Sequence, residues 1–352
     1  MKKIVLTGGG TAGHVTPNIA LLPHLKEAGY EVSYIGSYDG IEKKLIGDFG
    51  LPYYGISTGK LRRYFSWKNF SDPFRVLKGF SEAKKALKEI RPDVVFSKGG
   101  FVSVPVVRAA ASLHIPCIIH ECDMTPGLAN KLCIPVAQKV CCNFPETVSM
   151  LPADKAVLTG TPIREELFQG DRAKGLTLCG FTNEKPVIMV IGGSLGAVHV
   201  NDLVRAALPR LLKDFQVVHL CGNGKLDETL TGTPGYIQFE YVKEDLKHLF
   251  AAADVVISRA GANAICELLA LKKPNLLIPL PANASRGDQL LNARSYEAQG
   301  YSVVKEESEL TPDILADTMR ALYRDRDSYV SAMAKSTQTE AISTIMGLIT
   351  QV

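Results

Sequence analysis

The sequence predicts an α/β protein of two facing Rossmann-like lobes, each built on a doubly wound parallel sheet, with an interdomain cleft between them. Three observations support this prediction. The chain has 352 residues, and a single hydrophobic core stops growing at roughly 250–300 residues. Short apolar runs alternate with amphipathic helical stretches, as in βαβ units. The same alternation of apolar runs and helical stretches begins again in the second half, so we expect two similar lobes.

The first lobe is expected over residues 1–162. Its predicted strands are Lys3–Leu6, Glu31–Ile35, Asp93–Ser97 and Cys117–His120, and its predicted helices are Asn18–Ala28 and Phe80–Ile90. Strands that alternate with helices pair in parallel, so we expect helices on both faces of the sheet. The hinge between the lobes is expected near Gly160-Thr161-Pro162.

The second lobe is expected over residues 163–335, after a polar stretch at Glu166–Thr182. Its predicted strands are Val187–Ile191, Gln216–Leu220, Val255–Ser258 and Asn275–Ile278. A helical pattern continues from Asp327 to the end of the chain, and Gly347 is its one turn signal. Residues 336–352 are therefore expected to form a helix that either caps the second lobe or crosses back to the first, and the pattern leaves both paths open.

Composition excludes several classes of protein. Hydrophobic residues make up 46% and charged residues 22% of the chain, which is typical of globular domains and argues against bulk disorder. The formal net charge of +4 is too small to indicate nucleic-acid binding, and no reader motif is present. Membrane spans need roughly 18 apolar residues, and no stretch approaches that length. The apolar run in Met1–Thr7 predicts a first strand, so only peripheral contact with a bilayer is expected.

A glycine loop joins the first predicted strand to a helix and has the composition of an anion cradle. The backbone N–H groups of Gly9, Gly10 and Gly13 can approach a phosphate at the helix N-terminus. The loop lacks the Gly-Lys-Ser/Thr of a Walker motif, so a tight turn that binds nothing is the alternative. A second turn, at Gly99-Gly100, follows another strand, and two such loops would suit a diphosphate.

His14 ends the first glycine loop, where a neutral imidazole can take a proton from an attacking hydroxyl. We therefore predict that His14 is a general base. A histidine that only caps the helix, or that only satisfies its neighbours' hydrogen bonds, is the alternative. The segment His120-Glu121-Cys122-Asp123 ends a further strand, and we expect it to present its polar side chains at the cleft rim.

No metal site is expected. Adjacent His120 and Glu121 point to opposite faces of an extended segment, and nothing matches H-E-x-x-H. Asp325-Arg326-Asp327 resembles the D-x-D motif of another transferase architecture, but it lies among charged residues, so a solvated helical face is expected. The eight cysteines lack CxxC pairs and lie mostly in apolar runs, which favours reduced, buried thiols of a cytoplasmic protein.

The second half of the chain holds a denser set of polar motifs. The hydroxyl and amides of Gly192-Gly193-Ser194 suit a nucleotide diphosphate. Glu267 lies about one turn inside the helix that follows Ser258–Gly261, where it can accept hydrogen bonds from both hydroxyls of a ribose. A carboxylate that only favours the helix dipole is the alternative. Asp288–Asn292 offers an acid and an amide to sugar hydroxyls, or else it merely starts a helix.

Basic and aromatic residues interleave over Lys60–Lys78, a stretch that includes the only tryptophan. Cations attract anionic headgroups and aromatic rings partition into the interface, so we predict a peripheral membrane patch. Its predicted members are Arg62, Arg63, Phe65, Trp67 and Lys68. A loop that packs its aromatic rings under the first lobe is the alternative.

With these motifs in order, the sequence resembles the MurG family of glycosyltransferases over nearly its whole length. The resemblance rests on Gly8–Pro17, Gly99–Ser103, His120-Glu121, Gly160–Arg164, Gly192–Ser194, Arg259–Gly261 with Glu267, and Gln289 with Asn292. It implies the GT-B fold and an inverting transfer of N-acetylglucosamine from UDP-N-acetylglucosamine to the 4-hydroxyl of N-acetylmuramic acid in an undecaprenyl-diphosphate-linked muramyl pentapeptide. This step of peptidoglycan synthesis converts lipid I to lipid II at the cytoplasmic face of the cell membrane. The resemblance implies no metal and no cofactor.

The resemblance also implies roles for individual residues, with His14 as the general base. Ser194 and Arg164 would face the donor diphosphate. Backbone near Val242 would hold the uracil, Glu267 the ribose and Gln289 the sugar. Donor contacts are thus implied for Thr11, Arg164, Ser194, Val242, Glu267 and Gln289, and acceptor-diphosphate contacts for Gly9, Gly10, Gly13, Gly99, Gly100 and Asp123.

The chain departs from the family pattern at Cys122-Asp123, where the family usually has Gln-Asn. Because a carboxylate is unfavourable beside a diphosphate, a related GT-B transferase with a different glycolipid or glycan acceptor is one alternative. A UDP-N-acetylglucosamine epimerase and a non-catalytic nucleotide-binding protein are the others. His14 and the two glycine loops argue against the last, because a pure nucleotide sensor needs none of them.

Overall fold

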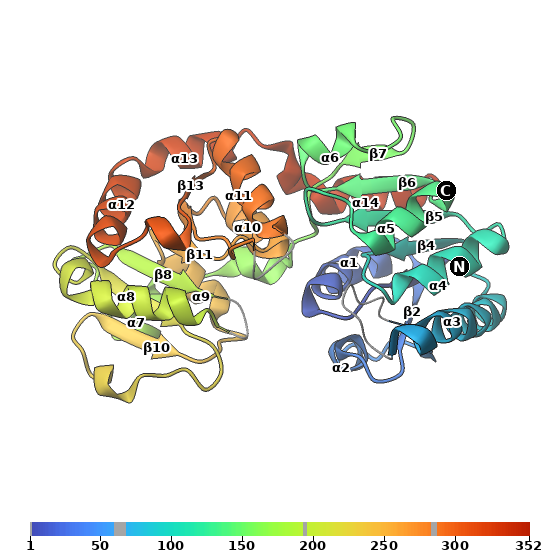
Figure 1. Ribbon diagram of the computed structural model, residues 1–352, viewed down its shortest axis with the longest axis horizontal. Coiled ribbons are helices and arrows are strands. Elements are labelled where there is room, and N and C mark those ends of the chain that lie inside the picture. Colours follow the sequence, from blue (N-terminus) through green and yellow to red (C-terminus); the bar gives the residue numbers. More distant parts are fainter. Residues whose placement is uncertain (1, 60–67, 193–195, 283–286) are drawn as a thin grey trace. The chain divides into compact units, whose positions relative to one another are not determined.

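The computed structural model describes residues 2–59, 68–192, 196–282 and 287–352 (Figure 1). The chain forms two compact units. Unit 1 comprises Met1–Arg164 and Thr337–Val352, and unit 2 comprises Glu165–Ser336. Each unit has its own parallel sheet, and buried apolar clusters pack against each sheet.

Unit 1 is built on a seven-stranded parallel sheet. Its strands are β1 (Lys2–Thr7), β2 (Tyr30–Ser37), β3 (Tyr53–Ile56), β4 (Val94–Ser97), β5 (Cys117–Glu121), β6 (Lys139–Cys142) and β7 (Ala156–Leu158). They lie in the order β3-β2-β1-β4-β5-β6-β7. The order reverses at the neighbours β1 and β4, where Thr7 lies opposite Ser97. Open α/β sheets bind ligands beyond the carboxyl ends of the strands at such a reversal.

Helices cover both faces of this sheet (Figure 1). They are α1 (Thr16–Glu27), α2 (Ile41–Gly47), α3 (Lys68–Ile90), α4 (Ser103–Ser112), α5 (Leu128–Cys133), α6 (Pro145–Ser149) and α14 (Ala341–Thr350), with the short 3-10 turns η1 (Ala12–His14), η2 (Ile134–Val136) and η6 (Thr337–Glu340). Ile4 and Leu6 of β1 face a core that includes α1 and α14, whereas Val5 faces a core that includes α3 and α4. Successive side chains of a strand point to opposite faces, so one sheet supports two cores.

Unit 2 repeats this architecture with a six-stranded parallel sheet. Its strands are β8 (Val187–Ile191), β9 (Gln216–Leu220), β10 (Tyr236–Phe239), β11 (Val255–Ser258), β12 (Asn275–Leu277) and β13 (Ser302–Val304), in the order β10-β9-β8-β11-β12-β13. Its helices are α7 (Arg172–Cys179), α8 (Val198–Leu211), α9 (Leu246–Ala252), α10 (Ala262–Ala270), α11 (Asp288–Ala298), α12 (Pro312–Arg324) and α13 (Arg326–Met333), with 3-10 turns η3 (Glu165–Gln169), η4 (Glu228–Leu230) and η5 (Glu307–Glu309). The strand order reverses at β8 and β11, the counterparts of β1 and β4.

The final helix, α14, packs in unit 1, although the sequence left its path open. Ile345 and Ile349 are buried in the core that includes α1, and the Tyr30 hydroxyl donates a hydrogen bond to the Ile349 carbonyl oxygen at 3.3 Å. The helical pattern that begins at Asp327 is interrupted at residues 334–336, between α13 and η6, where no glycine or proline marks the break.

Each strand predicted from the sequence is present within one or two residues of its expected bounds. The structure adds β3, β6, β7, β10 and β13, which lie at or next to the sheet edges. These strands are short and several are only half-buried, so their apolar runs are weak in the sequence. All eight cysteines are free and buried, as predicted. None of the described helices is long and apolar enough to cross a membrane.

Candidate functional site

The two glycine loops of unit 1 meet at the reversal of strand order. One follows β1 and the other follows β4, and the Gly9 N–H donates to the Gly99 carbonyl oxygen at 3.4 Å. Gly100 has a φ of +83°, and a Cβ on it would overlap the Gly9 carbonyl oxygen. Only glycine permits both this conformation and this close approach of two backbones. The sequence pattern therefore corresponds to one composite loop structure.

His14 lies beside both loops. It ends η1 and is half-buried, and its Nδ1 lies 2.9 Å from Oγ1 of Thr11. A Cβ on Gly100 would lie 3.4 Å from the same Nδ1. The Thr11 hydroxyl thus helps to orient the imidazole ring. A titratable ring in this place can act on a hydroxyl bound next to the glycine loops.

A buried carboxylate from α2 engages the first glycine loop, and the sequence analysis missed it. Glu42 is fully buried, its Oε2 accepts a hydrogen bond from the Gly10 N–H at 3.2 Å, and its Oε1 accepts one from the Ser37 N–H at 3.0 Å. A Cβ on Gly9 would lie 2.5 Å from the carboxylate carbon. The amides of Gly9 and Gly10 are therefore engaged within unit 1, and their contact with a diphosphate stays a prediction.

The prediction that His120 and Glu121 present polar side chains at a cleft rim is wrong, because both are buried within unit 1. The Glu121 carboxylate instead orders the following loop. It accepts hydrogen bonds from the Asp123 N–H at 3.1 Å, the Gly127 N–H at 3.0 Å and Asn130 Nδ2 at 2.9 Å. Burial raises the pKa of Glu121. Asp123 is half-buried, so it keeps the access to solvent that its predicted role requires.

A buried lysine that the sequence analysis also missed directly precedes the second glycine turn. Lys98 is fully buried, and its Nζ lies 2.8 Å from His120 Nδ1 and 3.1 Å from Thr161 Oγ1. His120 Nε2 lies 2.8 Å from the Gly160 carbonyl oxygen, which can only accept, so Nδ1 accepts from Lys98. Burial and then the Lys98 charge lower the pKa of His120 well below its ordinary value, so the ring is neutral.

The loops predicted to bind the nucleotide lie at the equivalent place in unit 2. The first runs from β8 to α8, and Ser194 in it lies outside the described residues. Gly196 has a φ of +68°, and a Cβ on it would overlap the Cys221 carbonyl oxygen, so this loop also requires glycine. The second runs from β11 into α10, with Gly261 in an extended conformation as the N-cap.

Two further predicted donor residues lie on helices near these loops. Glu267 is half-buried on α10. Gln289 lies in the first turn of α11, where its Oε1 accepts a hydrogen bond from the Leu280 N–H at 3.1 Å. Asn292 is fully buried, with Nδ2 at 3.5 Å from the Ala260 carbonyl oxygen. Asn292 thus holds α11 against the second loop, and Glu267 and Gln289 retain access to solvent.

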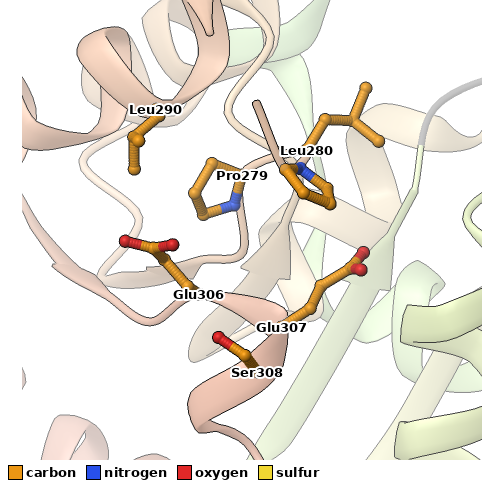
Figure 2. A pocket seen from close by; sticks show the side chains of 7 residues that line it. Pro279, Leu280, Leu290, Glu306, Glu307 and Ser308 are labelled. Atoms are coloured by element: carbon orange, nitrogen blue, oxygen red, sulfur yellow. The ribbon is translucent and has the colours of Figure 1, made fainter. Parts of the chain in front are cut away.

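A small pocket of about 190 Å³ opens beside α11 (Figure 2). Figure 2 shows an apolar side and an acidic turn, and the pocket is lined by Pro279, Leu280, Pro281, Leu290, Glu306, Glu307 and Ser308. Arg259 pairs with Glu307 and donates to the Ile278 carbonyl oxygen at 3.0 Å. Sites for whole drug-sized ligands measure about 300–1,000 Å³, so this pocket accommodates at most part of a ligand. The ion pair anchors the second loop of unit 2.

The remaining predicted residues are placed as follows. Val242 is half-buried in the loop after β10, and Arg164 is half-buried at the end of the first segment of unit 1. Asp325 and Asp327 are exposed at the start of α13, as expected for a solvated face. The predicted patch residues Arg62, Arg63, Phe65 and Trp67 lie outside the described residues, as does the side chain of Lys68. Within the described ranges, His, Cys, Asp and Glu side chains form no group of three that could hold a metal ion.

Comparison with protein families decides what the two units are. Residues 4–142 match the Glycosyltransferase family 28 N-terminal domain, and residues 187–348 match the Glycosyltransferase family 28 C-terminal domain. The chain belongs to glycosyltransferase family 28. The glycosyltransferase activity predicted from the motifs is thereby confirmed, and this family 28 enzyme is a hexosyltransferase.

Closely similar proteins carry one name. A protein of Lachnospira eligens is 69% identical over 349 residues, which cover 99% of each chain. One of Lachnoclostridium phytofermentans is 64% identical over 352 residues, which cover 100% of this family 28 chain and 99% of the relative. Both are named UDP-N-acetylglucosamine--N-acetylmuramyl-(pentapeptide) pyrophosphoryl-undecaprenol N-acetylglucosamine transferase.

Solved structures agree with this assignment. The crystal structure of Acinetobacter baumannii MurG matches 100% of both chains with a TM-score of 0.80 at 26% identity. The glycotransferase of kitacinnamycin matches 99% of this chain and 98% of its own with a TM-score of 0.75, but at 16% identity it shows the fold alone. The resemblance to the MurG family and the predicted GT-B fold of two parallel-sheet α/β lobes are confirmed for this family 28 glycosyltransferase.

Proposed function

We propose that this enzyme transfers N-acetylglucosamine from UDP-N-acetylglucosamine to the 4-hydroxyl of N-acetylmuramic acid in an undecaprenyl-diphosphate-linked muramyl pentapeptide, which converts lipid I to lipid II. The observation that carries the proposal is the 69% identity, over 99% of the chain, to a transferase of that name. The geometry supports it, because each unit places glycine-marked loops at its reversal of strand order. One unit can thus take the acceptor and the other the donor.

In the proposed reaction, His14 takes the proton of the 4-hydroxyl while the hydroxyl oxygen attacks the anomeric carbon of the donor sugar. The bond from that carbon to the UDP oxygen breaks in the same step, so the configuration inverts and UDP leaves with the electron pair. Thr11 lies 2.9 Å from His14 Nδ1 and orients the ring. The proton is therefore accepted at Nε2.

The proposed donor site combines backbone and side-chain groups of the loops already described. Arg164, Ser194 and the N-terminus of α8 stabilise the negative charge on the departing UDP. Backbone near Val242 holds the uracil, and Gln289 binds hydroxyls of the sugar. This scheme needs no metal ion, because the guanidinium group and the helix N-terminus supply the positive charge.

The proposal is tested by transfer of radiolabelled N-acetylglucosamine from its UDP donor to a short-chain lipid I analogue in the presence of EDTA. We expect the labelled disaccharide lipid to form and its yield to be unaffected by EDTA. Label that moves only to another glycolipid or glycan would instead support the transferase with a different acceptor. Epimerised sugar nucleotide formed without any acceptor would identify an epimerase.

The Glu267→Ala variant is expected to bind UDP-N-acetylglucosamine about 10- to 100-fold more weakly, because hydrogen bonds to a charged acceptor contribute about 1.5–3 kcal/mol. Isothermal titration calorimetry with the donor alone measures this change. Glu297→Ala, which removes an exposed carboxylate of α11, serves as the matched control and should bind the donor normally. Equal affinities of the Glu267 variant and this control would remove the ribose contact from the scheme.

We infer further that the enzyme binds the cytoplasmic face of the cell membrane through the start of α3. Phe74 and Leu77 expose 75% and 65% of their surface, and Arg75 and Lys78 beside them are also exposed. Apolar and cationic side chains together favour an anionic bilayer surface. These residues continue the basic-aromatic stretch that holds Arg62, Arg63 and Lys68.

Two variants are expected to sediment less with phosphatidylglycerol vesicles. Replacing Arg62, Arg63 and Lys68 with glutamine removes three cations that each contribute about 1 kcal/mol near an anionic surface. Replacing Phe74 and Leu77 with serine removes the apolar part. Phe168→Ser, which changes an exposed aromatic residue of unit 2, should sediment like the wild type. Unchanged sedimentation of both patch variants would contradict the membrane patch.

A further inference from the structure

The buried ammonium group of Lys98 has an unusual environment. Lys98 is fully buried at the carboxyl end of β4, and within the described residues its Nζ contacts only the ring nitrogens of His120 and the hydroxyl of Thr161. The Thr161 hydroxyl in turn donates to Asn143 Oδ1 at 2.8 Å, so this partner is neutral as well. Burying a charge without an opposite charge costs several kcal/mol. Among the described residues, Lys98 Nζ thus has no carboxylate as a hydrogen-bond partner.

The backbone and Cβ of Lys98 adjoin both glycine loops. Lys98 immediately precedes Gly99-Gly100. Its backbone N–H donates a hydrogen bond to the Thr7 carbonyl oxygen at 2.9 Å, where the first loop begins. Its Cβ lies 3.3 Å from the position that a Cβ on Gly8 would take. The chain that leaves the second turn enters α4, whose N-terminus adds partial positive charge at the same edge of the sheet.

We propose that Lys98 provides the electrostatic attraction for the diphosphate of the acceptor lipid, acting through the glycine loops without touching the ligand. The inference rests on the proposed function, which gives the acceptor a diphosphate. A fully buried ammonium group cannot reach the ligand itself, but in a medium of low dielectric constant its field is little screened by salt. Lys98 is therefore a positioning residue for the proposed reaction.

A purely structural role for Lys98 makes a different prediction. If Lys98 only connected β4 to His120 and Thr161, its replacement would lower stability and leave anion affinity unchanged. Replacing buried ion pairs with apolar side chains of similar volume is often neutral or stabilising, and removing an unpaired buried charge also removes its desolvation cost. Lys98→Met keeps the length of the side chain and removes the charge. Thr161→Val is the matched control, because it removes the hydrogen bonds of the Thr161 hydroxyl with Lys98 and Asn143 and keeps the Lys98 side chain.

The experiment makes two measurements. Calorimetry gives the affinity for inorganic pyrophosphate, with UDP present at saturation so that the nucleotide site is occupied. Transfer assays give the KM for a short-chain lipid I analogue. In Lys98→Met we expect pyrophosphate affinity to fall and acceptor KM to rise by roughly tenfold or more. The affinity for UDP-N-acetylglucosamine and the urea midpoint of unfolding should stay near the wild-type values. Thr161→Val should keep the wild-type acceptor KM.

Failure of this inference and failure of the proposed function give different results. Equal acceptor KM and equal pyrophosphate affinity in the wild type and Lys98→Met would overturn the role of Lys98 while transfer to lipid I stands. Equal shifts in Lys98→Met and Thr161→Val would overturn it too, because they would show a structural effect. A wild type that binds pyrophosphate in a Lys98-dependent manner but transfers nothing to lipid I would refute the proposed acceptor and retain the anion site.

Discussion

Replacing His14 with alanine is expected to lower the turnover of sugar transfer by roughly 10²- to 10⁴-fold, the range that a general base contributes. Donor binding should stay nearly unchanged, because the donor contacts are assigned to other groups. The expectation rests on the half-buried position of His14 beside both glycine loops and on the 2.9 Å contact of its Nδ1 with Thr11. Single-turnover transfer to a lipid I analogue and calorimetry with UDP-N-acetylglucosamine measure the two quantities.

The control for this variant is His114→Asn, which removes another imidazole of unit 1. His114 is exposed after α4 and has a φ of +60°, a conformation that asparagine tolerates. Its turnover should match that of the wild type. If His14→Ala instead weakened donor binding as strongly as Glu267→Ala does, the division of roles between the two residues would be incorrect.

Replacing Gly100 with alanine is expected to lower transfer at least tenfold and to reduce the free energy of unfolding by about 2 kcal/mol or more. A non-glycine residue at positive φ costs about 1–2 kcal/mol. In addition, the new Cβ would overlap the carbonyl oxygen of Gly9, which is backbone and cannot rotate away. The two loops would separate, and His14 would lose its position beside Gly100. Transfer assays and urea denaturation measure the two effects.

Gly50→Ala separates the cost of a positive φ from the overlap with backbone. Gly50 has a φ of +64° but open space where a Cβ would stand. This control should lose only the backbone contribution, about 1–2 kcal/mol, and should retain wild-type transfer. A Gly100→Ala enzyme with the stability of the Gly50 control and full activity would show that the close approach of the loops has no role in the reaction.

Much of the fold was predictable because its signals are local. Buried parallel strands are nearly continuous apolar runs, as in Val187–Ile191, and such runs need no partner to be recognised. The glycines at the carboxyl ends of β1, β4 and β8 mark turns that other residues fit poorly. The short edge strands, such as Ala156–Leu158, have no comparable signal.

The candidate site was predictable only in part. The glycine loops and His14 were identified because they form a contiguous motif. Glu42 and Lys98 were missed, since a single charged residue beside a helix or a glycine pair resembles many surface residues in a sequence. Their roles depend on burial, which the sequence does not show. The error at His120 and Glu121 has the same cause, because a polar pair at a strand end predicts exposure when its buried partners are unknown.

The sequence by itself determined the family, the two-lobed parallel α/β architecture and the order of the glycine motifs, because these depend on periodicity and on backbone conformations that few residues adopt. Tertiary structure alone decided that α14 returns to unit 1, since an apolar helix with Ile345 and Ile349 on one face can pack against many sheets. It also decided which amides and side chains the loops already use. Glu42 reaches Gly10, and Lys98 reaches Thr161 across 63 residues of chain, only because the strand order places β2 beside β1 and continues from β4 through β5 and β6 to β7.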